Sequence, residues 1–256
     1  MWLAYLRSEP TAHGPLDDPA LTALYRHPQP AENMIMVRSN FVQSLDGSIT
    51  GVDGRSGSVN TPADQQVFAL HRAHADAILV GAGTARAEGY RAVDLAPWQS
   101  AVRAAEGMGG HPALVIVSRR LDVDPAVARP VRGPGGPVLV ITTERAAADR
   151  GRRLREAGVE VVGLGADDVD LARLPGELAD RGLRRVVCEG GPQLHRDLLA
   201  ADLVDELSLT LAPRVVGGSG PRTTAGAPLD GDLRFVPELV LVADDGTVFT
   251  RYGRVG

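Results

Sequence analysis

Lysine is absent from the 256 residues, so all 27 basic residues are arginine. Without lysine the chain has no Gly-Lys-Ser/Thr phosphate loop and forms no Schiff base with a carbonyl substrate or with pyridoxal phosphate. A bound anion must therefore be held by arginine, by backbone N–H groups or by helix N-termini.

Cysteine occurs once, at Cys188. One cysteine excludes a disulfide framework and a zinc site built from several thiolates. No spacing of histidine, cysteine and carboxylate residues indicates a metal site, so we expect no metal. Cys188 stands at the end of an apolar run, where a small apolar side chain is its usual role.

Aromatic residues make up only 4% of the chain, and the net charge is −5. No basic run interleaved with aromatic residues is present, which argues against nucleic acid as a partner. There is also no run of 18 uncharged apolar residues, and the N-terminal "MWLAYLRSEP" has too short an apolar part for a secretory signal. We expect a cytoplasmic protein that binds neither nucleic acid nor a membrane.

Short apolar runs alternate with helical patterns from Met34 onward, which predicts an α/β fold with a mostly parallel sheet and helices on both faces. The predicted strands are 34–43, 76–81, 113–118, 138–143, 159–164, 184–189 and 205–212. The predicted helices are 62–75, a helix from about Thr84, 144–157, 170–182 and 192–201. Residues 92–111, with the glycine-rich "EGMGGH", are predicted to be an irregular connection.

The two ends of the chain differ from this repeating pattern. Residues 237–255 predict two antiparallel strands joined at Asp245-Gly246, because Asp-Gly is a hairpin turn dipeptide. Residues 1–33 are rich in proline and polar residues around one amphipathic stretch, and we interpret them as an N-terminal arm. No flexible linker divides the rest, so residues 34–256 are predicted to form a single domain.

The stretch "CEGGPQLHRDLL" combines a carboxylate, two glycines and a proline at the end of a predicted strand. A buried strand delivers Glu189 to its carboxyl end, Gly190 and Gly191 give access to the backbone, and Pro192 suits the first helical position. Ligands in open α/β sheets lie at this edge, and an uncovered helix N-terminus attracts phosphate. The alternative is a tight strand-to-helix turn without a ligand.

A second glycine turn, in "DAILVGAGTARAEG", has the same arrangement. Gly81 and Gly83 follow an apolar strand, and Thr84 is predicted to cap the next helix. The turn is not the dinucleotide fingerprint, because the next glycine is Gly89 rather than one three positions on. A Rossmann dehydrogenase is therefore disfavoured.

The strand "ALVIVS" is followed by two arginines, which gives a third candidate for phosphate binding. Ser118, Arg119 and Arg120 place a hydroxyl and two guanidinium groups just outside the sheet. A planar guanidinium grips phosphate oxygens through two hydrogen bonds, so these residues suit the extra 2′-phosphate of NADPH. Surface arginines after a strand are also common without such a role.

Four motifs together resemble one known family. "SLDGSIT", "HRAHADAILVGAGT", "CEGGPQLHRDLLAADLVDELSLTLAP" and "VVGG" are similar to the reductase domain of riboflavin biosynthesis, within the dihydrofolate reductase-like superfamily. The resemblance runs from about Phe41 to Gly218. It implies a dihydrofolate reductase-like three-layer fold, a homodimer, and NADPH-dependent reduction of 5-amino-6-(5-phosphoribosylamino)uracil to its ribityl form.

The resemblance also implies the site residues. Asp46 and Glu189 are the candidate catalytic residues. Ser58, or Ser56 if the loop is read differently, together with Arg72, Arg91 and Glu189, is implied to bind substrate. The implied cofactor-binding residues are Gln43, Ser44, Gly81, Gly83, Thr84, Glu88, Ser118, Arg119, Gly190, Gly191, Pro192, Gln193 and Leu194.

The chain departs from the family pattern in one segment. Where the family has Asp-Asp-Pro and then a Leu-Thr-x-Arg run, this chain reads "AEGYRAVDL". Leu95 takes the place of the second substrate arginine, and Arg91 is the nearest substitute. The His-x-Glu and Pro-Cys-x-x-Cys signature of the zinc deaminase that often precedes this reductase is absent, so no deaminase domain is expected.

Two other functions remain open from the sequence. One is a dihydrofolate or pteridine reductase on the same scaffold, whose substrate also carries a pyrimidine amide edge that a carboxylate can bind. The other is a non-catalytic nucleotide-binding module. His71 and His74 are predicted to lie on the helix surface rather than to act as ligands.

Overall fold

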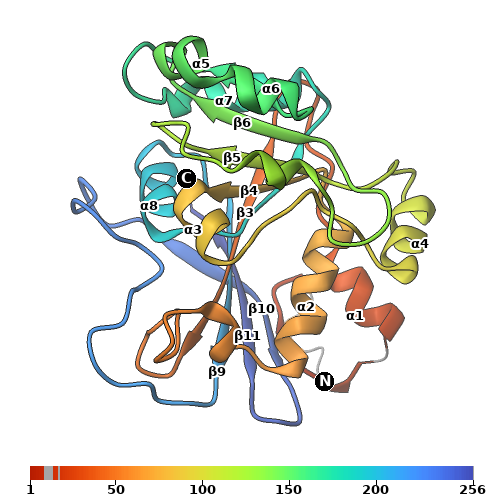
Figure 1. Ribbon diagram of the computed structural model, residues 1–256. Coiled ribbons are helices and arrows are strands. Elements are labelled where there is room, and N and C mark those ends of the chain that lie inside the picture. The colour runs from red at the N-terminus through yellow and green to blue at the C-terminus, as the bar shows by residue number, and fades with distance from the viewer. Residues whose placement is uncertain (9–13, 17, 256) are drawn as a thin grey trace.

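The computed structural model describes residues 1–8, 14–16 and 18–255. These residues form one twisted sheet flanked by helices (Figure 1). The sheet has 11 strands in the order β2-β1-β10-β11-β9-β3-β8-β4-β5-β6-β7. The strands are β1 (Trp2–Leu6), β2 (Gly14–Pro15), β3 (Met36–Ser44), β4 (Ala77–Gly81), β5 (Ala113–Val117), β6 (Val138–Thr142), β7 (Glu160–Gly163), β8 (Arg185–Cys188), β9 (Glu206–Ala212), β10 (Phe235–Val242) and β11 (Val248–Arg254). The helices are α1 (Asp18–Tyr25), α2 (Pro62–Ala73), α3 (Ala82–Ala87), α4 (Pro97–Ala105), α5 (Glu144–Arg150), α6 (Arg152–Glu156), α7 (Leu174–Ala179) and α8 (Pro192–Ala200).

The sheet has a parallel and an antiparallel part. All neighbours from β9 through β7 pair in parallel, as the alternation of apolar and helical segments predicted. The strands between β2 and β9 pair antiparallel, and β10 and β11 form the predicted hairpin around Gly246, whose φ is +85°. The predicted α/β class, with a mostly parallel sheet and a C-terminal antiparallel hairpin, is confirmed.

Helices cover both faces of the parallel part, which gives three layers. One apolar cluster joins alternate residues of β4, β5, β6 and β8 to α7 and α8. The residues that alternate with these on the same strands point to the opposite face of the sheet, where they form a second apolar cluster with α3 and α6. Because side chains alternate across a strand, continuous apolar runs such as "ALVIV" serve both layers. α1 and α2 form a third cluster with β10 and β11.

Three parts of the helix prediction were wrong. Residues 92–111 contain α4, which starts at Pro97 because proline suits the first turn, and which carries no internal glycine. The predicted helix 144–157 is divided at Gly151 into α5 and α6, and the predicted helix 170–182 consists of a 3₁₀ turn, Leu171–Arg173, followed by the short α7. Glycine and proline within these stretches shorten the helices.

The described residues of the N-terminal segment, 1–8, 14–16 and 18–33, contribute to the sheet and to its cover. β1 pairs with β10 along Trp2–Leu6, and α1 packs through Leu21 and Tyr25 onto the cluster that contains α2. The side chain of Tyr25 is 1% exposed. This segment is therefore packed into the fold through both β1 and α1.

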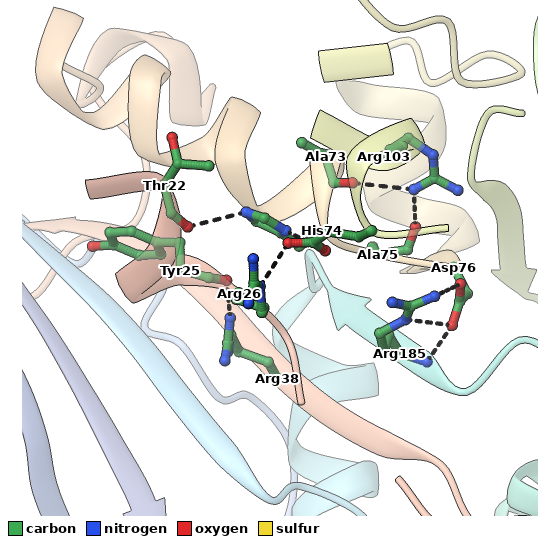
Figure 2. A network of polar contacts seen from close by, with 11 residues as sticks. Thr22, Tyr25, Arg26, Arg38, Ala73, His74, Ala75, Asp76, Arg103 and Arg185 are labelled. Atoms are coloured by element: carbon green, nitrogen blue, oxygen red, sulfur yellow. Dashed lines mark hydrogen bonds and ion pairs between the residues drawn. The ribbon is translucent and has the colours of Figure 1, made fainter. Parts of the chain in front are cut away.

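A network of polar contacts ties α1, α2, β3 and α4 together at the end of the sheet where the parallel strands begin (Figure 2). His74, at the end of α2, contacts Glu106 through Nδ1 at 2.9 Å and the backbone oxygen of Thr22 through Nε2 at 3.2 Å. Arg26 donates to the same Glu106 carboxylate at 2.8 Å. These contacts join the C-terminal end of α2 to α1 and to the residue that follows α4.

Buried arginines extend this network. Arg38 on β3 is 1% exposed, pairs with Glu206 on β9 and donates to the Tyr25 backbone oxygen at 3.0 Å. Arg103 on α4 donates to the backbone oxygens of Ala73 and Ala75, just before β4. Each guanidinium therefore has partners that offset the cost of burying its charge.

The prediction that His71 and His74 lie on the helix surface was wrong. Both side chains are fully buried, because α2 is covered by α1 on one side and by the sheet on the other. His71 Nε2 lies 3.1 Å from the Ser208 hydroxyl on β9. Neither residue is exposed to solvent.

No helix within residues 1–8, 14–16 and 18–255 is both long enough and apolar enough to cross a membrane.

Candidate active site

A cavity of about 500 Å³ opens where β3, β4 and β8 reach their carboxyl ends. Its walls come from β3, the loop 49–60, α2, residues 84–94 and the turn 189–192. This is the edge at which open α/β sheets bind ligands. The two predicted glycine turns both reach it, since Thr84 and Gly191 line the wall together with Glu189.

The two glycine turns pack directly against each other. The backbone N–H of Gly81 donates to the Gly190 oxygen at 2.7 Å. A Cβ on Gly191 would clash with the Thr84 hydroxyl oxygen, so no larger residue fits there without movement. Gly190 has φ +87°, a left-handed conformation that favours glycine. The close approach of the two turns therefore favours glycine at position 191, and the backbone conformation favours it at position 190.

The prediction that Thr84 caps the helix was wrong. α3 starts at Ala82 with Gly81 as its N-cap, and Thr84 lies inside the helix. The chain turns into the helix as soon as β4 ends, because Gly81 can act as an N-cap through its backbone alone. The Thr84 hydroxyl faces Gly191 and the cavity instead.

Helix α2 presents one stripe of side chains to the cavity. Asp64, Phe68 and Arg72 follow one another at intervals of four residues, so they lie on the same face of the helix, and all three line the wall. Thr61 caps the helix, and its hydroxyl accepts from the Asp64 N–H at 3.2 Å. The stripe thus offers a carboxyl, an aromatic ring and a guanidinium in one row.

Arg72, Glu189 and Tyr90 form a compact triad in the wall. Arg72 donates to both carboxylate oxygens of Glu189, through Nε at 2.8 Å and through Nη2 at 2.7 Å. Tyr90 donates its hydroxyl to Glu189 Oε2 at 2.6 Å. The Arg72 guanidinium also lies 4.3 Å from the centre of the Phe68 ring. Glu189 is thus satisfied by protein partners, as the cost of burying a carboxylate requires.

The triad perturbs the pKa values of its members. Burial disfavours the Arg72 cation, but the Glu189 carboxylate and its hydrogen bonds outweigh this and hold the pKa of Arg72 above its usual value. Burial, reinforced by the negative charge of Glu189, raises the pKa of Tyr90 well above its usual value. Arg72 stays charged and Tyr90 stays neutral throughout the physiological pH range.

Asp46 lies on an exposed turn and holds a loop. Its carboxylate accepts from Ser44 Oγ, from the Gly217 N–H at 2.7 Å and from the Val216 N–H at 3.2 Å. The bond from Ser44, followed by those from the two backbone groups, lowers the pKa of Asp46 to about 2. Asp46 does not line the cavity and its carboxylate is occupied by these three hydrogen bonds, so the geometry favours a structural role over proton transfer.

The predicted substrate residues lie at different distances from the cavity. Ser56 lines the wall, whereas Ser58 is exposed and donates to Asp53 at 2.6 Å, so of the two serines Ser56 is the one that reaches the cavity. Glu88 lines the cavity and accepts from the Ser56 N–H at 3.0 Å. Arg91 also lines it, and its Nη1 donates to the Tyr90 backbone oxygen at 2.9 Å.

Several predicted cofactor residues lie around the cavity rather than in its wall. Gly83 and Gln193 are exposed beside the glycine turns, and Leu194 is buried in the core because it faces the sheet. Pro192, by contrast, lines the wall. Ser118 is buried and its hydroxyl accepts from the Asp122 N–H at 3.2 Å. Arg119 is exposed. Gln43 and Ser44 end β3 beyond the lining residues 40–42.

Four cavity residues that bear on its chemistry were missed from the sequence, namely Asn40, Asp64, Phe68 and Tyr90. Tyr90 lies within the segment "AEGYRAVDL", whose departure from the family pattern we interpreted only as the loss of an arginine. Asp64 stands in a polar first helical turn, where an acidic residue is expected for the helix dipole alone. Asn40 lies on a predicted strand, and the alternation of side chains along a strand shows only which residues share a face of the sheet with Asn40, not that this face borders a cavity. The signal for Asp64 is its spacing of eight residues from Arg72, which puts both on one helix face.

In the part of the chain that the structure describes, no three histidine, cysteine, aspartate or glutamate side chains lie close enough to hold a metal ion.

Comparison with known sequences gives one family. The family model described as the RibD C-terminal domain matches residues 35–247. The chain is 31% identical over 187 residues to a 2,5-diamino-6-ribosylamino-4(3H)-pyrimidinone 5′-phosphate reductase of Aquifex aeolicus, covering 72% of this chain and 79% of the relative. It is 28% identical to the riboflavin biosynthesis protein RibD of Bacillus amyloliquefaciens, covering 77% of this chain but only 50% of that protein.

Solved structures agree with this family. A pyrimidine reductase-like protein of Corynebacterium diphtheriae superposes with a TM-score of 0.74 at 29% identity, covering 87% of this chain and 92% of the other. The Saccharomyces riboflavin biosynthesis reductase Rib7 superposes with a TM-score of 0.65 at 18% identity, covering 94% of this chain and 100% of the other, which supports the fold alone.

Proposed function

Because the chain belongs to the family of the RibD C-terminal domain, we propose that it is an NADPH-dependent reductase that converts a phosphoribosylamino-pyrimidine to its ribityl form in riboflavin biosynthesis. As a member of this family it is an oxidoreductase. The observation that carries the proposal is the cavity at the strand ends, with the two glycine turns on one side and the Asp64–Phe68–Arg72 stripe on the other.

The residues around the glycine turns suit a phosphorylated dinucleotide. Apart from its chain neighbours and the backbone of its own helix, no atom lies within 4 Å of the position that a Cβ on Gly83 would take, so a ligand can approach the backbone there. Arg119, with the Ser118 hydroxyl, would bind the 2′-phosphate, and backbone groups of Gly83 and Gly191 would bind the pyrophosphate. Without lysine, these backbone groups and arginines are the available anion ligands.

NADPH, when bound, supplies a hydride to C1′ of the ribosyl group. The ring oxygen O4′ leaves C1′ and takes up one proton, so the ribosylamino group becomes a ribitylamino group. Phe68 provides an aromatic surface on which the pyrimidine can stack. Of the two arginines that line the cavity, Arg72 is paired with Glu189, whereas Arg91 has no carboxylate partner among the described residues. The triad fixes Arg72 and Tyr90, so the wall is formed before substrate binds.

The test is NADPH oxidation at 340 nm with the phosphoribosylamino-pyrimidine as substrate. We expect turnover with NADPH and at least 10-fold weaker use of NADH, since the 2′-phosphate adds a charge-assisted contact. Glu189→Gln should lower kcat/KM far more than it lowers NADPH affinity. A chain that binds NADPH without oxidising it would contradict the proposal, and so would reduction of dihydrofolate alone.

The same proposal includes a cytoplasmic homodimer, in accord with the family resemblance. Sedimentation equilibrium of the purified chain tests the dimer, and a single species at the 26.9 kDa of the monomer would contradict it.

A further inference from the structure

The cavity contains a buried carboxyl that has no role so far. Asp64 is 4% exposed and lines the wall next to Phe68. Glu189 is already held by Arg72 and Tyr90, whereas no ion pair of Asp64 is present among the described residues. Of these two carboxyl groups, Asp64 is therefore the one left to receive hydrogen bonds from a substrate.

A second acceptor lies on the neighbouring strand. Asn40 on β3 lines the same cavity, is 9% exposed, and its Oδ1 has no hydrogen-bond partner among the described residues. Val42 stands opposite Thr210 in the register of β3 and β9, so Asn40 and Thr210 point to the same face of the sheet. Thr210 hydrogen-bonds the Asp64 carboxyl. Asn40 and Asp64 line the cavity and form one polar corner of it, whereas Thr210 is 1% exposed, does not line the cavity and supports Asp64 from the sheet.

The burial of Asp64 and its shortage of hydrogen-bond donors suit a carboxyl group that binds a ligand. Burial raises the pKa of Asp64 to about 6, although the hydrogen bond from Thr210 opposes the shift. A buried acceptor without a donor costs free energy, and proteins rarely retain one without a ligand or water to satisfy it. The corner therefore favours a ligand edge that carries N–H groups.

The two candidate bases differ at this edge. A 2-amino-4-oxopyrimidine presents N3–H and a 2-amino N–H side by side, and a carboxylate accepts from both in a parallel pair. A uracil presents one N–H between two carbonyl oxygens, so one carboxylate oxygen would face a carbonyl lone pair. A carboxylate discriminates between these edges because it only accepts.

We propose that Asp64, assisted by Asn40, recognises the 2-amino-4-oxo edge of the substrate's pyrimidine ring, so that the chain acts on the 2-amino base rather than on the uracil. The assignment of this edge to a ribosylamino substrate rests on the proposed function. A pterin carries the same edge, so recognition of the edge and identity of the substrate need separate measurements.

Binding of the bare bases tests the recognition without any turnover. Calorimetry with 2,5,6-triaminopyrimidin-4-one and with 5,6-diaminouracil gives the ratio of the two affinities. We expect the first to bind about 10–100-fold more tightly, the range for one good bidentate pair. Asp64→Asn, which keeps the shape but turns one acceptor into a donor, should lower this ratio to one or invert it.

Asp205→Asn is the matched control, because Asp205 lies outside the cavity and bonds the Val37 N–H at 2.7 Å. It should leave the ratio unchanged. Equal affinity of the wild-type chain for the two bases would overturn the proposal, as would an Asp64→Asn variant that binds both more weakly by the same factor. The latter result would show a purely structural carboxyl.

Turnover assays separate this inference from the proposed function. If both phosphoribosylamino-pyrimidines are reduced and the uracil form has the higher kcat/KM, the inference fails and the proposed function stands. If neither is reduced but the base preference and its dependence on Asp64 hold, the inference stands and the proposed function fails. Reduction of dihydrofolate, lost in Asp64→Asn, would support the recognition of the edge and assign it to a pterin.

Discussion

Replacing Glu189 with glutamine tests whether the triad is as important for the fold as its geometry indicates. The glutamine side chain would retain one acceptor and would turn an amide N–H₂ towards the donors of Arg72 or of Tyr90. Breaking a fully buried pair costs about 3–5 kcal/mol. The Arg72 side chain is 24% exposed and Glu189 2% exposed, so water can reach the cation in part. We therefore expect Glu189→Gln to lower the free energy of unfolding by about 2–3 kcal/mol.

Urea unfolding followed by circular dichroism measures this loss, and calorimetry should show a fall of about 5–10 °C in Tm for a chain of this size. Glu160→Gln is the matched control. Glu160 pairs with Arg181 at 2.6 Å but its side chain is 55% exposed, and an exposed pair contributes under about 1 kcal/mol. The double variant Arg72→Met/Glu189→Gln should lose less than the sum of its single variants, because the first change removes the unpaired charge.

An unfolding free energy of Glu189→Gln within about 0.5 kcal/mol of the wild-type value would refute this reasoning. So would additivity in the double variant. Either result would mean that solvent, rather than Glu189, satisfies the Arg72 cation, and that Glu189 is available to the substrate.

Three further predictions follow from contacts elsewhere. Burial, followed by the positive charge of Arg38, holds the pKa of His71 well below its usual value. The folded chain therefore binds fewer protons at His71 than the unfolded chain does, so the contribution of His71 to the free energy of unfolding is lost as the pH falls below about 6.5. The stability advantage of the wild-type chain over His71→Gln should shrink by about 1.4 kcal/mol per pH unit below that value, and an equal gap at pH 5.5 and 7.5 in urea unfolding would contradict it. Gly191→Ala should cost about 1–3 kcal/mol because its Cβ meets the Thr84 hydroxyl, and the added change Thr84→Ala should restore much of the loss; absence of any such rescue in thermal unfolding would exclude that clash as the cause. Asp46→Ala should increase tryptic cleavage in the loop 214–222 while kcat falls less than about 10-fold, and a fall of several hundred-fold would instead indicate that Asp46 takes part in proton transfer.

The sequence predicted the parts of the fold that depend on local pattern. Apolar runs gave the parallel strands, and Asp245-Gly246 gave the hairpin, because both signals are contained in a few neighbouring residues. Helix α4 was missed because the glycines after it suggested a loop, although Pro97 marks its start. The burial of His71 and His74 depends on α1, which is distant in sequence and carries no signal for this contact.

Part of the candidate site could also be located from the sequence. Glu189, Arg72 and the glycine turns could be located from strand ends and from the family resemblance, and the structure brings them together. That Glu189 is satisfied by Arg72 and Tyr90 could not be predicted, since a bidentate pair depends on side-chain geometry across 117 residues of chain. The polar corner at Asp64 likewise arises only when α2 packs on β3 and β9.

No described residue before Asn40 lines the cavity, so the described N-terminal residues are connected to it only through their contacts with α2. Thr22 of α1 contacts His74 at the C-terminal end of α2, and Arg26 contacts the same histidine's partner Glu106, which follows α4. Helix α2 carries the row of side chains that would grip the substrate. Removing residues 1–26 would therefore destabilise α2, which forms one wall of the cavity. Substrate affinity would then fall although none of the removed residues that the structure describes contacts the substrate.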